Sequence, residues 1–70
     1  MTLKVARVAA GYTQKEAAKR LGVSVPAVCA WETGIAEPRA GSFMAACELY
    51  GVDPKDIFLP SRDEKVRDEK

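Results

Sequence analysis

The chain contains no histidine, only two cysteines and one tryptophan, and no long run of apolar residues. Without histidine it lacks the common Cys/His zinc spacings and the histidine-assisted nucleophiles of hydrolases. Cys29 and Cys47 are far apart in sequence, and we expect both to be reduced apolar side chains rather than a disulfide. No segment approaches the roughly 20 apolar residues of a membrane helix, and no apolar run behind Lys4 forms a secretory signal. These absences favour a cytoplasmic protein without metal, cofactor or membrane contact.

The apolar content is sufficient for one small folded domain. Apolar residues make up 47% of the 70 residues, which is typical of a globular protein. A domain of this length buries only about 60% of the surface that the unfolded chain exposes. Its stability therefore depends on an efficient helical core, on a partner subunit, or on both.

Charge is unevenly distributed along the chain, although the net charge is only +1. Residues 1–31 hold five basic side chains and one acidic side chain, whereas residues 32–60 hold two basic and five acidic ones. Such a division suits a domain that turns one face towards a polyanion. It is equally compatible with ordinary surface charge.

Turn and cap residues divide the chain into five short helices, without the alternation of a strand. Helix ends are marked by glycines, which readily adopt the left-handed conformation found there: Gly11, Gly22, Gly34 and Gly51. Helix starts are marked by residues that cap backbone amides: Thr13 with Glu16, Ser24, and Asp53 with Pro54. The pattern predicts an all-α domain over residues 1–60, with helices at 2–10, 14–21, 25–33, 41–50 and 54–59.

The last ten residues differ in composition from the rest. Residues 61–70 repeat the sequence Arg-Asp-Glu-Lys around Val66. A segment this polar buries too little apolar surface to order itself. We expect a charged, flexible tail, and a helical extension that contacts a partner is the alternative.

The segment from Gln14 to Thr33 has the spacing of two helices joined by a tight turn. Helices that cross at roughly 90–120° need a small residue at the crossing and a left-handed residue in the turn, and Ala18 and Gly22 supply them. Apolar residues at helical spacing along the chain predict the core: Leu3, Ala6, Tyr12, Ala17, Leu21, Val28, Trp31, Phe43, Cys47, Tyr50, Ile57 and Phe58.

These motifs resemble the lambda-repressor/Cro-type helix-turn-helix family, also called the XRE family. The resemblance covers residues 3–59 and rests on the stretch 13–24 (TQKEAAKRLGVS), on 31–34 (WETG) with Pro38, and on 49–54 (LYGVDP) with Ile57 and Phe58. It implies a compact five-helix lambda-repressor-like domain. In that domain the helix at 14–21 crosses the phosphate backbone of double-stranded DNA, and the helix at 25–33 enters the major groove.

The resemblance also implies which polar residues contact phosphate. Gln14 matches the family's glutamine at the start of its helix, where the side-chain amide and the helix N-terminus both suit an anion. With the basic residues nearby, the expected phosphate contacts are Thr13, Gln14, Lys15, Lys19, Ser24, Thr33 and Arg39. Capping and solvent exposure are the alternative for Thr13 and Gln14.

Arg7 and Glu32 match a pair that links the first and third helices in this family. We expect a largely buried ion pair between them. Two solvated surface charges are the alternative.

The exposed face of the helix at 25–33 is expected to read bases, although it carries none of the family's common polar readers. The expected base contacts are Val25, Pro26, Ala27, Cys29 and Ala30. None of these side chains can make the bidentate hydrogen bonds that discriminate guanine or adenine, so the thymine methyl is the feature left to read. A weakly specific surface and a protein-binding patch are the alternatives.

The resemblance implies a sequence-specific DNA-binding transcriptional regulator of phage-repressor type. We expect a homodimer, because two half-sites multiply affinity. The contact is expected from the helix at 54–59, from its flanks (Ile57, Phe58 and Leu59) or from the charged tail. The alternative is an antitoxin-like or coactivator-like interaction module that keeps the fold, which the apolar helix face and Glu37 favour. No arrangement of residues suggests an enzyme or a small-molecule ligand.

Overall fold

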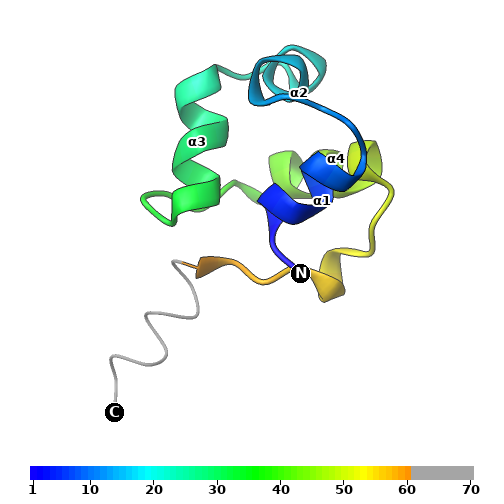
Figure 1. The fold of residues 1–70 in the computed structure, drawn as a ribbon. Helices are drawn as coiled ribbons and strands as arrows, with labels where there is room; N and C mark the ends of the chain where they lie inside the picture. Colours follow the sequence, from blue (N-terminus) through cyan, green and yellow to red (C-terminus); the bar gives the residue numbers. More distant parts are fainter. Residues whose placement is uncertain (61–70) are drawn as a thin grey trace.

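The computed structural model describes residues 1–60, which form four α-helices and a final 3-10 turn (Figure 1). The helices are α1 (Leu3–Ala9), α2 (Gln14–Leu21), α3 (Val25–Thr33) and α4 (Ala40–Tyr50), and the turn is η1 (Pro54–Asp56). The all-helical architecture is as predicted, and the helices expected at 14–21 and 25–33 have those bounds. The charged segment 61–70 lies outside the described residues.

Side-chain caps explain why the helices begin where they do. The Thr2, Thr13 and Ser24 hydroxyls accept hydrogen bonds from the backbone amides of the first turns of α1, α2 and α3. At α2 the capping box is complete, because the Thr13 amide donates to the Glu16 carboxylate at 2.9 Å. This hydrogen bond holds the pKa of Glu16 below its ordinary value. Its contribution to folding is therefore present at neutral pH and is lost in acid.

The turn between α2 and α3 depends on small residues and one left-handed glycine. Gly22 ends α2 with φ of 72° and ψ of 31°, and the Val23 amide then donates to the Ala18 carbonyl at 3.0 Å. Ala17 and Ala18 are at most 3% exposed, and their small side chains let the two helices approach closely. Figure 1 shows α2 lying across one end of α3 as a result.

The core lies between all four helices and is closed by the end of the described chain. Its buried apolar residues are Leu3, Ala6, Ala17, Ala18, Val28, Trp31, Ala46, Cys47, Tyr50 and Leu59. Four predicted core residues are half-buried and pack against this cluster: Tyr12, Leu21, Phe43 and Ile57. The prediction for Phe58 is wrong, because its side chain is 45% exposed and its neighbour Leu59 is buried instead.

The expected fifth helix at 54–59 is also wrong, because the helical conformation stops at Asp56. Ile57 is extended, with φ of −98° and ψ of 127°. The Phe58 amide donates to the Met1 carbonyl at 2.7 Å, in an isolated parallel bridge between Thr2 and Phe58. Pro60 also disfavours a helical conformation at Leu59. In an extended segment, alternate side chains face opposite sides, so Leu59 enters the core and Phe58 turns outward.

We predict that two glycine-to-alanine substitutions change the free energy of unfolding in opposite directions, although neither new methyl group meets a steric clash. A Cβ at Gly22 or at Gly41 has no heavy atom within 4 Å, but only Gly22 has a positive φ. Gly22→Ala should lower the free energy of unfolding by about 1 kcal/mol through backbone strain. Gly41→Ala, inside α4, should raise it by about 0.5–1 kcal/mol. Urea unfolding of both variants measures this, and a shift of the same sign in both would contradict the assignment of the turn.

Candidate nucleic-acid interface

A cluster of three side chains, the buried Arg7 and Glu32 and the half-buried Gln14, joins α1, α2 and α3. The Arg7 Nε donates to the Glu32 Oε2 at 2.7 Å, and the Arg7 Nη2 donates to the Glu32 Oε1 at 3.2 Å. The two side chains are only 8% and 3% exposed. The third Arg7 donor, Nη1, reaches the Tyr12 carbonyl at 2.7 Å in the loop between α1 and α2. The pair expected between these residues is therefore a bidentate, buried ion pair.

Gln14 completes this cluster from the first turn of α2. Its Nε2 donates to the Glu32 Oε1 at 3.0 Å. The hydrogen bond with Glu32 raises the pKa of Arg7 above its ordinary value and so favours the charged guanidinium. Sequence reasoning treated Gln14 as a contact to phosphate and missed its bond to Glu32, because the two residues are 18 positions apart. The cluster fixes how α2 and α3 sit on α1.

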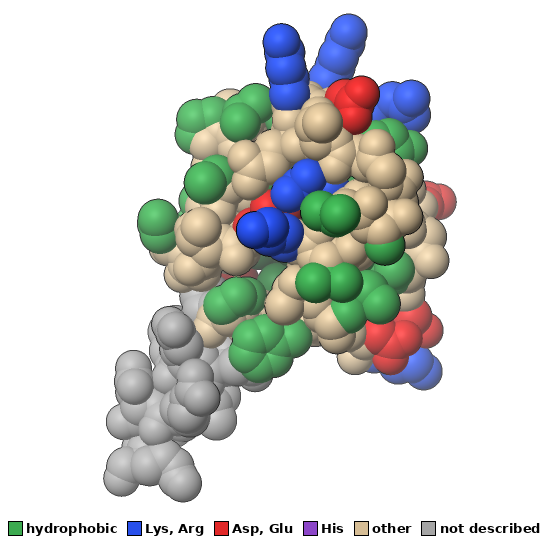
Figure 2. Space-filling model, in the orientation of Figure 1, with side chains coloured by type: hydrophobic (Ala, Val, Ile, Leu, Met, Phe, Trp, Pro, Cys, Tyr) green, Lys and Arg blue, Asp and Glu red, His purple; other side chains and the backbone are tan. Residues whose placement is uncertain are grey.

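The exposed surface of α2 is basic. Lys15, Lys19 and Arg20 are all exposed, and Glu16 is the one acidic residue of this helix. Figure 2 shows basic side chains projecting from the end of the molecule where Figure 1 places α2. At the opposite end of the molecule, η1 and its N-cap hold the exposed acidic residues Asp53 and Asp56, with the exposed Lys55 between them. The basic surface of α2 is therefore set apart from these two acidic side chains.

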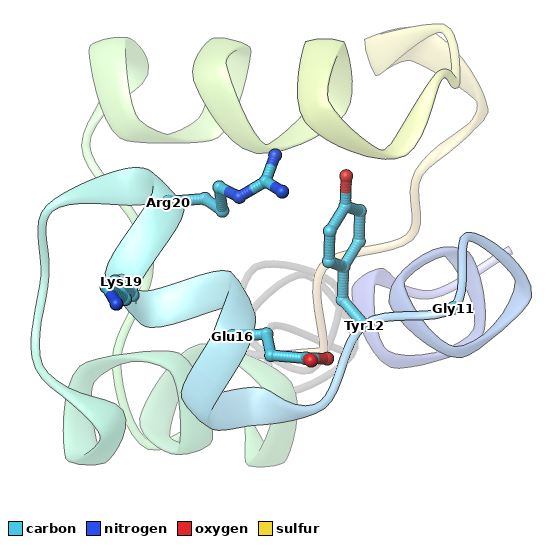
Figure 3. A pocket seen from close by; sticks show the side chains of 5 residues that line it. All are labelled: Gly11, Tyr12, Glu16, Lys19 and Arg20. Atoms are coloured by element: carbon cyan, nitrogen blue, oxygen red, sulfur yellow. The ribbon is translucent and has the colours of Figure 1, made fainter.

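The charged group of Arg20 packs against an aromatic ring, unlike those of Lys15 and Lys19. Its guanidinium carbon lies 5.5 Å from the centroid of the Tyr12 ring, within the range of a cation–π interaction. Figure 3 shows both side chains extending towards α4 at the edge of an open hollow that Gly11, Glu16 and Lys19 also line. Arg20 thus stabilises the packing of Tyr12, whereas Lys15 and Lys19 remain at the surface.

The outward face of α3 is apolar. Val25 is 38% exposed, Pro26 and Cys29 are exposed, and Ala27 and Ala30 are half-buried. Ala27 also packs against the core, so its backbone position is fixed. Within α3 the one charged residue is Glu32, whose side chain points into the buried cluster. The five residues predicted to read bases therefore form a surface without charge.

The polar side chains at the two ends of α3 already bond within the protein. The Ser24 hydroxyl accepts from the Ala27 amide at 3.2 Å, at the start of the helix. The Thr33 hydroxyl donates to the Cys29 carbonyl at 3.0 Å, one turn earlier in the same helix. Both residues remain at the surface.

The loop after α3 contains the most exposed large apolar side chain of residues 1–60. Gly34 ends α3 in the left-handed conformation, with φ of 87°, and Ile35 directly after it is 81% exposed. Arg39 precedes α4 and is exposed, as is Glu37 in the loop. Sequence reasoning did not single out Ile35, although an isoleucine in a glycine- and proline-bounded loop was a signal available to it.

A second exposed apolar group lies on α1 and was also missed. Met1, Val5 and Val8 are 55%, 53% and 58% exposed. Val5 and Val8, three residues apart, lie on one side of α1, and Met1 comes directly before Thr2, the N-cap of the helix. Phe58 adjoins this stripe through its bond to the Met1 carbonyl. We call these four residues the α1 stripe.

The two cysteines have different surroundings. Cys29 is exposed on α3, whereas Cys47 is buried in α4, and neither forms a disulfide. Burial raises the pKa of the Cys47 thiol, which makes the reactive thiolate rarer. No group of three metal-ligating residues gathers among residues 1–60, and none of the helices there has the length and apolarity to cross a membrane.

Comparison with known families matches residues 3–57 to the helix-turn-helix family of Cro/C1 type, the XRE family. No curated protein and no solved structure matches the chain. The family match spans well over half of the chain, and its helix-turn-helix corresponds to α2 and α3. The chain therefore belongs to this family, whose members are DNA-binding regulatory domains.

We predict that removing one partner of the buried pair destabilises the domain far more than removing an exposed charge from the same helix. Arg7→Met leaves the Glu32 carboxylate buried with too few donors and should cost about 3–5 kcal/mol in the free energy of unfolding. Lys4→Met, an exposed change on α1, should cost about 0.5 kcal/mol or less. Thermal and urea unfolding at equal protein concentration measure both.

A double variant separates the buried charge from the lost packing. Arg7→Met combined with Glu32→Leu should be more stable than Arg7→Met alone by at least about 1 kcal/mol, because no unpaired charge is then buried. A double variant less stable than Arg7→Met alone would show that the unpaired Glu32 carboxylate is not the main cause of the stability lost in Arg7→Met.

Proposed function

We propose that this domain is a sequence-specific transcriptional regulator of phage-repressor type that places α3 in the major groove of double-stranded DNA. The observation that carries the proposal is the rigid placement of an uncharged α3 surface beside a basic α2. The docking itself is taken from the helix-turn-helix family. In that geometry α2 crosses the phosphate backbone and the first turns of α3 face the base edges.

The proposed phosphate contacts divide into cations and hydrogen-bonding groups. Lys15, Lys19 and Arg39 supply exposed positive charge, which gives affinity without sequence preference. The caps and helix ends supply hydrogen bonds: Thr13, Gln14, Ser24 and Thr33. Gln14 uses one amide proton on Glu32 and has a second to offer, so the buried cluster would orient it towards phosphate rather than remove it from the interface.

The proposed base readout is contact with thymine methyl groups by Val25, Pro26 and Ala27, with Cys29 and Ala30 on the following turn. The absence of charge on this face supports it, since an apolar surface gains free energy against a methyl group and none against an unpaired amide or carbonyl. About 0.8 kcal/mol for each buried methyl group gives modest discrimination per base. Several methyl contacts and two half-sites are needed for a specific operator.

We further propose that two copies bind together through the α1 stripe. The dimer surface proposed here differs from the one expected from the sequence, because the fifth helix is absent from residues 1–60 and Leu59 is buried. Phe58 remains exposed beside Met1. Val5 and Val8 extend the same apolar surface along α1. A second copy of the chain is the occupant that the two half-sites of an inverted repeat require.

A protein-binding module is the second candidate function, and Ile35 favours it. Its side chain is 81% exposed, in the loop that follows the C-cap of α3, Gly34. A contiguous exposed apolar surface is typical of protein interfaces. In that case the basic face of α2 would be ordinary surface charge.

Selection from a random duplex library at moderate salt, followed by sequencing, tests the proposal. We expect enrichment of an inverted repeat whose half-sites are centred about ten base pairs apart, with thymines at the positions that α3 faces. Enrichment of single half-sites would contradict the dimer. Recovery of no motif, together with binding that does not weaken as salt rises, would contradict specific DNA binding and favour the protein module.

The exposed thiol of Cys29 reports directly whether α3 lies in the groove. N-Ethylmaleimide should label Cys29 in the free domain, while buried Cys47 reacts only on unfolding and serves as the internal reference. The enriched duplex should slow labelling of Cys29 in proportion to the fraction of protein bound. A duplex of equal length without the motif is the control. Labelling at the free rate in a saturated complex would exclude docking through α3.

A further inference from the structure

The C5 methyl group of thymine also occurs on a second DNA base, 5-methylcytosine. In the major groove, thymine shows its C5 methyl beside the O4 acceptor, and cytosine shows the N4 amino donor. Methylation of cytosine at C5 puts a methyl group at the same place on the pyrimidine ring. Thymine and 5-methylcytosine then differ in this groove by one acceptor against one donor, and by the matching change on the purine partner.

A protein can distinguish thymine from 5-methylcytosine only with a group that hydrogen-bonds to the thymine O4 or to the cytosine N4 amino group. The outward face of α3 offers none of the usual ones, since its residues 25–30 are valine, proline, alanine and cysteine. The thiol of Cys29 is a weak donor and a weak acceptor. Ser24 and Thr33, the hydroxyl residues that flank the face, each make one bond to the backbone of α3, and the proposed complex assigns their remaining hydrogen-bonding capacity to phosphate. Within residues 25–30, a polar group of either base therefore meets no strong partner.

The nearby charged and amide side chains do not change this. The Glu32 carboxylate would be the natural acceptor for the cytosine amino group, but it is 3% exposed and accepts from Arg7 and Gln14. Arg7 is held in the same cluster, 8% exposed, with its Nε, Nη1 and Nη2 all donating within the protein. The fold thus withdraws from the surface the charged residue that α3 contains.

We propose that the domain reads the C5 methyl group itself, so that 5-methylcytosine substitutes for thymine at the positions that α3 contacts. The inference rests on the proposed DNA-binding function and names its ligand class as duplex DNA with methylated pyrimidines. Cytosine methylation then creates binding sites that the unmethylated sequence lacks. The regulator responds to the methylation state of its operator through the same apolar face that reads thymine.

Two parallel selections from random libraries test this, and neither requires a known operator. One random library is copied with ordinary dCTP and the other with 5-methyl-dCTP. We expect thymine alone at the contacted positions in the first motif and a mixture of thymine and cytosine in the second. Thymine alone in both motifs would overturn the inference while leaving DNA binding established. Recovery of no motif from either library would overturn the proposed function and the inference with it.

Binding measurements on one duplex then give the size of the effect. At one contacted position, thymine is compared with uracil, and 5-methylcytosine with cytosine, by fluorescence anisotropy at constant salt. Each methyl group should tighten binding about fourfold, the factor that corresponds to burial of one methylene-sized group. A clear preference for thymine over uracil with no preference for 5-methylcytosine over cytosine would mean that the methyl group is read only beside the O4 acceptor, and would overturn the inference.

Matched serine variants assign the effect to α3. Val25→Ser should reduce both methyl ratios below about twofold, because a hydroxyl replaces the apolar contact. Val8→Ser makes the same change on the α1 stripe. It should leave both ratios near fourfold even where it alters overall affinity. Equal methyl ratios in Val25→Ser and the unsubstituted protein would show that another surface reads the methyl group, contrary to the inference.

Discussion

Glu32 lies almost fully buried where three helices meet, and a carboxylate in such a place destabilises a fold unless its oxygens find donors. Arg7 supplies two of those donors and Gln14 a third, while the last donor group of Arg7 holds the Tyr12 carbonyl. The network ties α1, the loop after it, the start of α2 and the end of α3 together. The orientation of α3 therefore depends on this network as well as on the turn at Gly22.

The same network decides what kind of surface the domain exposes. Because the charged residue of α3 is turned inward, the outward face keeps only apolar side chains such as Val25 and Cys29. Three exposed basic residues lie on α2, whereas Asp53 and Asp56 lie on and beside η1 at the other end of the molecule. In the proposed complex, affinity and selectivity thus come from different helices. Lysines attract the phosphate backbone, and the apolar face of α3 contributes the preference for methylated pyrimidines.

The end of the described chain shows how a local signal can be outweighed. Asp53 and Pro54 form a good helix start, and a helix is the conformation that they favour by themselves. The hydrogen bond between the Phe58 amide and the Met1 carbonyl, with Pro60 just beyond, holds the segment extended instead. In the extended conformation Leu59, rather than Phe58, occupies the core. It also joins Phe58 to the exposed residues of α1 and so moves the proposed dimer surface.

The sequence alone determined the elements that depend on nearest neighbours: the helices at 14–21 and 25–33, the capping box at Thr13 and the left-handed turn at Gly22. Residues matched to the family motif also indicated the pair of Arg7 with Glu32. Tertiary structure decided what depends on contacts between distant segments. These are the bond of Gln14 to Glu32 and the extended end at Phe58. The physical reason is that local caps and turns act within four residues, whereas a buried carboxylate or an open backbone amide takes whichever partner the assembled helices bring near.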